Sequence, residues 1–325
     1  MERADEEHYL TIAEKLAEGR MVPFLGAGAN LCDRGDQVWE QGGSFLPSGA
    51  ELAQHLAARG RYPMHEELDL LRVSQYVDAA RGEDELYLYL REVFDPEFPP
   101  TSLHRLLARA ARALGEAGLP HLLVVTTNYD DLVERALAEE GLECDVIWYE
   151  AKQNAEARGR FVHRAPGRKP TVNARPNKYT RLPIVLERPA VLKLHGCLDR
   201  ASADDDSYVI TEDSYIDYLS VGDVGAAIPI ALSQRMTSNS LLFLGYSLSD
   251  WNLRVVLNRI WGASKLQSKS WAVQREPADP NQSKIEEALW ETPERANVEL
   301  VYCELSEYVH ELEARLPGAV PATPG

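Results

Sequence analysis

Four segments of the 325-residue chain carry residue types that could do chemistry, and each follows a short apolar run. They are Gly26–Gly28 (GAG), Thr126–Asp130 (TTNYD), His195-Gly196 and Gly245–Asp250 (GYSLSD). In open parallel sheets the carboxyl ends of the strands meet at one edge, and ligands bind beyond that edge. We therefore expect the four segments to assemble into one site.

His195 is the candidate for proton transfer. Imidazole is the side chain that titrates near neutral pH, and a strand end is a good position for a general base. Asn128 and Asp130 could take part beside it, although residues at this position also serve as helix N-caps. Thr126 and Thr127 could likewise be turn residues.

The glycines of the first and last segments suit close contact between the backbone and a ligand. Gly26-x-Gly28 after a strand permits the approach of a diphosphate, and Gly245 and Ser247 suit a ribose or a phosphate. Tight turns use glycine as well, so this signal alone leaves both readings open. The dehydrogenase fingerprint fails at its third glycine, where Leu31 stands, and no strand ending in an acidic residue follows about 20 residues later. Hydride transfer is thereby disfavoured.

The elements that would position these segments alternate between strands and helices. Strand patterns cover residues 21–25, 121–126, 145–149, 190–194, 208–210, 241–244, 271–273 and 298–302. Helical patterns cover residues 4–18, 50–115, 130–140, 212–220, 224–237, 250–261 and the chain from 306. This order predicts an α/β fold, a doubly wound Rossmann-like parallel sheet with a helical insertion. We expect a single domain over residues 1–316, with an insertion at 42–118, a basic loop at 150–189 and a disordered tail at 317–325.

Charge and composition narrow the functional classes. The net charge is −17, which argues against direct binding of nucleic acid by the bulk surface. Residues 152–188 nevertheless carry a net +8, so this loop either contacts an anion or a partner, or is simply solvated. No apolar run approaches the roughly 20 residues of a membrane span, and the first residues lack the apolar core of a secretory signal. We expect a soluble, cytoplasmic protein.

The four cysteines offer no metal site by their spacing. Cys32, Cys144, Cys197 and Cys303 stand far apart, and no CxxC pair exists. A zinc ribbon and a redox dithiol are therefore not encoded, and we expect free thiols and no metal.

In combination, GAGAN (26–30), TTNYD (126–130), LHG (194–196) and GYSLSD (245–250) resemble the sirtuin-like family over residues 20–262. The segments VLKLHGCLD, YVITEDSY and FLGYSLSDWNLR look specifically like the bacterial branch found in antiphage defence systems. Two departures from the protein-deacylating sirtuins matter. The paired CxxC motifs of their zinc module are missing, and residues 29–40 lack their extended loop, which puts protein deacylation in doubt.

The resemblance implies an NAD⁺ hydrolase that releases nicotinamide and ADP-ribose and depletes NAD⁺ when activated during phage defence. NAD⁺ would be the substrate, and no metal would be needed. It implies that His195 is the general base, that Asn128 positions the ribose or water, and that Asp130 holds the nicotinamide. The residues that would bind the rest of NAD⁺ are Gly26, Ala27, Gly28, Asn30, Thr127, Gly245 and Ser247.

It also implies a homo-oligomer and a possible protein partner such as a HerA-type ATPase. Two alternatives stay open. The first is an NAD-dependent ADP-ribosyltransferase or deacylase, and the second is a non-catalytic module that senses ADP-ribose or NAD⁺.

Overall fold

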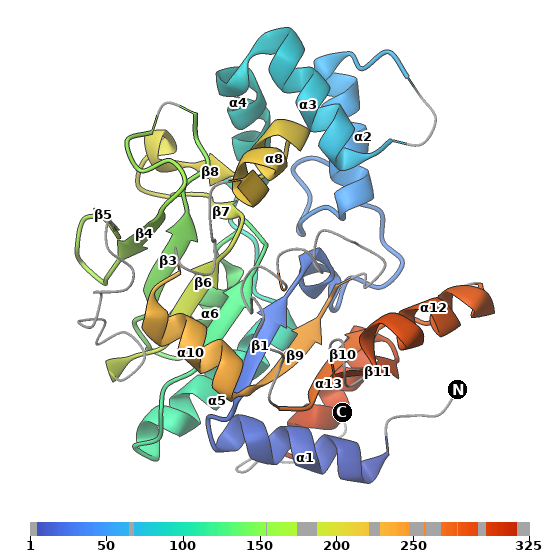
Figure 1. The fold of residues 1–325 in the computed structure, drawn as a ribbon, viewed down its shortest axis with the longest axis vertical. Helices are drawn as coiled ribbons and strands as arrows, with labels where there is room; N and C mark the ends of the chain where they lie inside the picture. Colours follow the sequence, from blue (N-terminus) through green and yellow to red (C-terminus); the bar gives the residue numbers. More distant parts are fainter. Residues whose placement is uncertain are drawn as a thin grey trace.

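A nine-stranded sheet, in the order β11-β10-β9-β1-β2-β6-β3-β4-β5, forms the centre of the computed structural model (Figure 1). The structure describes residues 5–64, 68–153, 155–173, 187–220, 228–246, 257, 268–277, 279–291 and 297–316. The strands are β1 (Met21–Leu25), β2 (Leu123–Thr126), β3 (Asp145–Tyr149), β4 (Phe161–Arg164), β5 (Thr171–Val172), β6 (Ala190–Lys193), β9 (Ser240–Leu244), β10 (Ser270–Gln274) and β11 (Val298–Tyr302). A separate two-stranded sheet pairs β7 (Gly196–Cys197) with β8 (Ser207–Tyr208).

The strands from β11 to β3 are parallel, and β4 and β5 add an antiparallel edge. The central strands are buried along their whole length, which is why they are continuous apolar runs rather than alternating ones. The predicted α/β fold with a mostly parallel, Rossmann-like sheet is confirmed. The strands β4, β5 and β7 were not predicted.

Helices cover both faces of this sheet. The described helices are α1 (Glu6–Ala17), η1 (Ala27–Leu31), α2 (Gly49–Gly60), α3 (Leu70–Arg81), α4 (Glu83–Phe94), α5 (Ser102–Glu116), α6 (Leu132–Glu139), η3 (Ala203–Asp205), α8 (Glu212–Ser220), α10 (Ile230–Ser238), α12 (Pro280–Trp290) and α13 (Leu305–Glu313). Apolar residues of α1, α5, α6 and α13 pack on one face. Those of α8, α10 and α12 pack on the other, so the sheet is doubly wound.

Helices α2, α3 and α4 stand together away from the sheet (Figure 1). They enclose a core of their own, to which Leu132, Leu198, Tyr208 and Ile210 contribute. Helix α5 belongs instead to the layer on the sheet. The predicted helix at 250–261 lies outside the described residues except for Leu257, as do residues 221–227 and the tail 317–325. The division into one domain with an insertion at 42–118 stays a prediction.

The described part of the basic segment is tied to the body of the protein. Arg158 pairs with Asp217 on α8, and Arg164 pairs with the buried Asp199. Lys152 Nζ donates to the backbone oxygen of Asp204 at 3.2 Å. These cations therefore hold local structure, while residues 174–186 of the segment lie outside the described part. No described helix is long and apolar enough to cross a membrane.

Candidate active site

The ends of four neighbouring strands align at one edge of the sheet. Leu25 pairs in register with Leu244 of β9 and Thr126 of β2, and Thr126 pairs with Lys193 of β6. The four segments that follow these strands therefore begin side by side, as the sequence predicted. Ser247 and the rest of its segment to Asp250 lie outside the described residues.

Glycine is required where the loops after β1 and β9 cross. A Cβ added to Gly26 would lie 2.7 Å from the Gly245 carbonyl oxygen, and one added to Gly28 would lie 2.8 Å from the Gly245 Cα. Gly245 itself has φ +73°, and its Cβ would overlap the backbone nitrogen of Ala29. These glycines therefore allow the backbone of one loop to pack on that of the other. This packing alone explains why glycine occurs at these positions, without any ligand.

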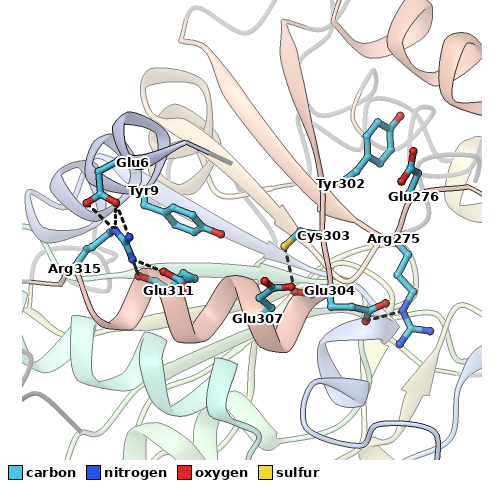
Figure 2. A pocket seen from close by; sticks show the side chains of 10 residues that line it. All are labelled: Glu6, Tyr9, Arg275, Glu276, Tyr302, Cys303, Glu304, Glu307, Glu311 and Arg315. Carbon is cyan, nitrogen blue, oxygen red and sulfur yellow. Dashed lines mark hydrogen bonds and ion pairs between the residues drawn. The ribbon is translucent and has the colours of Figure 1, made fainter. Parts of the chain in front are cut away.

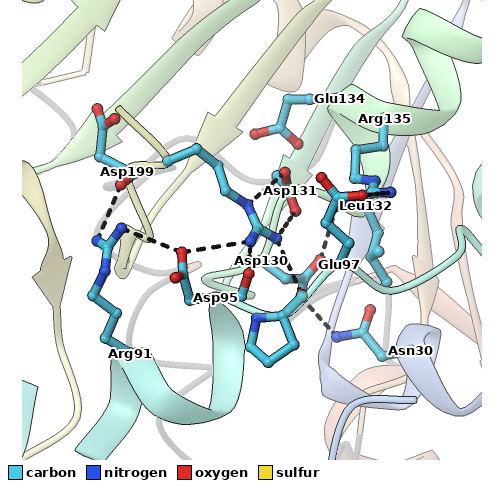
Figure 3. A network of polar contacts seen from close by, with 12 residues as sticks. Asn30, Arg91, Asp95, Glu97, Asp130, Asp131, Leu132, Glu134, Arg135 and Asp199 are labelled. Carbon is cyan, nitrogen blue, oxygen red and sulfur yellow. Dashed lines mark hydrogen bonds and ion pairs between the residues drawn. The ribbon is translucent and has the colours of Figure 1, made fainter. Parts of the chain in front are cut away.

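A chain of side-chain hydrogen bonds links the loops after β1 and β2. Asn128 Nδ2 donates to the Gly26 carbonyl oxygen at 3.0 Å and lies 3.5 Å from Asn30 Oδ1. Asn30 Nδ2 donates to Asp130 Oδ2 at 2.7 Å (Figure 3). The other oxygen, Asp130 Oδ1, accepts the backbone N–H of Leu132 at 3.1 Å, where α6 begins. Asp130 thus joins Asn30 to the residue that begins α6, whose N-cap is Asp131 rather than Asp130. Asn128 is held against the GAG turn.

Lys193 is a buried lysine that contacts the loop after β2. It was not predicted as a site residue. Its side chain is only 1% exposed, and its Nζ lies 2.7 Å from Glu134 Oε1 and donates to the backbone oxygen of Asp130. Burial alone would lower the pKa of Lys193, but the charge and hydrogen bond of Glu134 act together with the charge of Asp130 to hold that pKa above its ordinary value. The sequence signal was a lysine inside an apolar strand, which needs a buried partner.

His195 lies directly beyond β6 and is 6% exposed. Its Nδ1 is 3.2 Å from the Tyr215 hydroxyl, and its ring makes edge contacts with the rings of Tyr215 and Tyr218, at 5.2 and 5.6 Å between centroids. Its Nε2 is buried without a hydrogen-bond partner among the described residues. Burial lowers the pKa of His195 to about 3, so the imidazole is neutral at pH 7 and one of its ring nitrogens carries a free lone pair.

Gly196 and Thr127 have partners within the protein. Gly196 has φ +91°, and a Cβ there would overlap the carbonyl oxygen of Ser207 where β7 and β8 pair. The Thr127 hydroxyl is 2.7 Å from the Tyr246 hydroxyl, which joins the loops after β2 and β9. Gly196 is therefore glycine for packing against β8.

A cavity of about 420 Å³ opens beside the GAG turn. Ala27, Gly28, Gly245 and Tyr246 form one end of it, and the ends of β10 and β11, including Gln274, form the other. A pocket of this size suits a small organic ligand. The sequence had not marked the ends of β10 and β11, whose residues carry no glycine or histidine signal.

A second cavity of about 430 Å³ adjoins the first and shares Arg275, Cys303 and Glu304 with it (Figure 2). Five glutamates line it, namely Glu6, Glu276, Glu304, Glu307 and Glu311. Its arginines are already paired, since Arg315 bonds Glu6 and Glu311 and Arg275 bonds Glu304 at 3.0 Å. The five carboxylates would repel a diphosphate, whereas the first cavity has only two, Asp33 and Glu304, and is therefore the candidate ligand site. No cluster of three or more metal-ligating side chains occurs among the described residues.

Comparison with known proteins identifies the family of this chain. A model of the SIR2-like domain matches residues 122–295, which is more than half of the chain. The NAD(+) hydrolase ThsA of Acinetobacter baumannii is 28% identical over 77% of this chain and 41% of its own. The ThsA of Enterococcus faecium is 27% identical over 81% and 45%, and Defense-associated sirtuin 2 of Bacillus subtilis is 24% identical over 80% and 21%. The chain thus spans less than half the length of these relatives. By the extent of the family match, it belongs to the SIR2-like domain family.

Proposed function

We propose that the protein is an NAD⁺ hydrolase that cleaves the N-glycosidic bond of nicotinamide. The observation that carries this proposal is His195, a neutral histidine with a buried and unpartnered Nε2 at the edge where the loops after β1, β2 and β9 meet. The names of the ThsA relatives, which describe NAD(+) hydrolases, support the choice of substrate. In this proposal NAD⁺ is the substrate, and its cleavage needs no metal.

The proposed reaction requires few chemical steps from the side chains of this protein. The bond between the ribose C1′ and the nicotinamide nitrogen breaks, and the electron pair leaves with the ring, which is neutralised as it departs. Water adds to the oxocarbenium-like carbon, and its proton goes to His195 Nε2. Because the leaving group is good, the protein mainly orients the substrate and delivers water. In this proposal Asn128 orients the ribose or the water.

The cavity beside the GAG turn gives the substrate an orientation. We place the diphosphate against Ala27 and Gly28, where no side chain longer than a methyl intervenes. The adenosine half then extends toward Gln274, and the nicotinamide half extends toward Asn128 and His195. Asn30, Thr127 and Ser247 complete the set of NAD⁺-binding residues in this proposal.

The direct test follows nicotinamide and ADP-ribose release from purified protein by liquid chromatography. With and without the product of the neighbouring gene, we expect turnover by the wild type in at least one condition, loss of it in His195→Ala, and a strong reduction in Asn128→Ala with the fold retained. Equal rates in wild type and His195→Ala under both conditions would refute the proposal. Transfer of labelled ADP-ribose to protein in excess of hydrolysis would favour a transferase, and ADP-ribose binding without turnover would favour a sensing module.

We further propose that the activity serves antiphage defence in the cytoplasm and is gated by assembly. An ungated enzyme of this kind would deplete the NAD⁺ of its own cell, so a homo-oligomer or a protein partner such as a HerA-type ATPase is the expected control. Light scattering with and without the product of the neighbouring gene, paired with the nicotinamide assay, tests this. A monomer that is fully active alone would contradict it.

A further inference from the structure

Helix α8 presents two tyrosines, one turn apart, to the imidazole of His195. Tyr215 and Tyr218 both set their ring edges against it, with interplanar angles of 76° and 82°. The Tyr215 hydroxyl in addition reaches Nδ1, at 3.2 Å. The two residues therefore give similar packing to His195, whereas the hydrogen bond to Nδ1 comes from Tyr215.

Hydrogen bonds at the start of α8 fix the position from which Tyr215 contacts His195. The Ser214 hydroxyl accepts the backbone N–H groups of Ile210 and Thr211, both at 2.9 Å, and the Ser214 N–H donates to Thr211 Oγ1 at 3.0 Å. The side chain of Gln75 on α3 donates to Asp213 Oδ2 and accepts the backbone N–H of Asp213, at 2.9 Å each. Tyr215 directly follows Asp213 and Ser214, so the hydrogen bonds of these two residues also fix its position.

A neutral imidazole has one N–H and one free lone pair, and only the nitrogen with the lone pair can take up a proton. Nε2 is buried and has no protein partner among the described residues, so it is the nitrogen that we assign to the reacting group. It carries the lone pair only when the proton sits on Nδ1. That N–H is buried and needs an acceptor, which the Tyr215 hydroxyl oxygen supplies before and after proton uptake at Nε2.

We infer that Tyr215 is a positioning residue that holds His195 in the tautomer with the proton on Nδ1 and the lone pair on Nε2. This inference rests on the proposed role of His195 as the base. Tyr215 touches no substrate in it and acts only through the imidazole. Losing the hydroxyl leaves either a buried N–H without an acceptor or the tautomer that cannot accept a proton.

The test compares Tyr215→Phe with Tyr218→Phe, a matched pair on the same helix that each lose one hydroxyl and keep the ring. In the nicotinamide assay we expect Tyr215→Phe to lower kcat about 10- to 100-fold, the worth of one buried hydrogen bond, with KM nearly unchanged. Tyr218→Phe should keep kcat within a few-fold. Unchanged kcat in Tyr215→Phe, with His195→Ala inactive, would overturn the inference and leave the proposed function standing.

A second readout does not depend on turnover. Nitrogen NMR of protein labelled with ¹⁵N-histidine reports which ring nitrogen bears the proton, and the His195→Gln variant assigns the signals. We expect the Nδ1–H form in the wild type and in Tyr218→Phe, and a mixed or reversed tautomer in Tyr215→Phe. A wild-type spectrum with the proton on Nε2 would overturn the inference whether or not NAD⁺ is cleaved, whereas failure of the proposed function alone would show as an inactive wild type with the expected spectrum.

Discussion

The burial of His195 predicts a specific loss of stability in acid. A histidine whose pKa is about 3 in the folded protein resists protonation there, whereas in the unfolded chain it binds a proton near pH 6.5. Between these values the unfolded state holds more protons, so the free energy of unfolding decreases as the pH falls. Replacing His195 by glutamine removes the group and with it this part of the pH dependence.

The magnitude follows from the two pKa values. At pH 5 the unfolded chain gains about 2 kcal/mol from protonating this one residue, and at pH 7 it gains only about 0.2 kcal/mol. The wild type should therefore lose about 2 kcal/mol more stability than His195→Gln when the pH falls from 7 to 5. Further loss continues toward pH 3, below which the folded protein is protonated as well.

Urea unfolding followed by circular dichroism at pH 7 and pH 5 measures this difference. His195→Phe serves as a second non-titrating variant, since its packing differs from that of glutamine but its reduced pH dependence should be the same. If the wild type and both variants lost equal stability between the two pH values, the imidazole would not be held neutral by burial. The account of His195 as a buried, neutral imidazole would then lose its physical basis.

Three further substitutions test the architecture around the site. Gly245→Ala forces a Cβ into a residue at φ +73° and should lower the stability by at least about 1–3 kcal/mol in urea unfolding. Lys193→Met leaves the Glu134 carboxylate buried without its partner and should cost about 3–5 kcal/mol, while the double variant with Glu134→Leu should recover most of that in the same assay. Arg164→Glu sets a carboxylate against the buried aspartate it now pairs with and should lower the melting temperature, whereas Arg168→Glu, at an exposed position, should leave it unchanged.

The sheet could be predicted because its central strands are buried on both faces. Runs such as 241–244 contain only large apolar residues, and their spacing by helical segments fixes a parallel order. Strand β4, with the sequence FVHR, has half-buried polar residues and pairs antiparallel with both neighbours, so no apolar run marks it. The two-residue strands β5 and β7 are too short for any periodicity to register.

The sequence predicts at which edge of the sheet the candidate site residues lie, but not which side chains they contact. Strand ends locate Asn128 and His195 at one edge, since parallel strands share a direction. The partners of these residues come from elsewhere in the chain, however. Tyr215 stands 20 residues after His195 and reaches it only because α8 folds back over the sheet. No local pattern encodes such a contact, although Tyr215 closes the segment YVITEDSY that the family resemblance had singled out.

The carboxylate of Asp130 already accepts hydrogen bonds from within the protein, and these compete with any binding of NAD⁺. The family resemblance gives it the nicotinamide carboxamide, yet Oδ1 accepts from Leu132 and Oδ2 from Asn30. The carboxamide can bind only by sharing an oxygen or by displacing the Asn30 amide. If Asp130 acts mainly by holding Asn30, Asn30→Ala should impair NAD⁺ cleavage about as much as Asp130→Asn, and the double variant little more. Independent binding roles would instead make the two losses multiply, and kcat/KM for the three variants and the wild type distinguishes the cases.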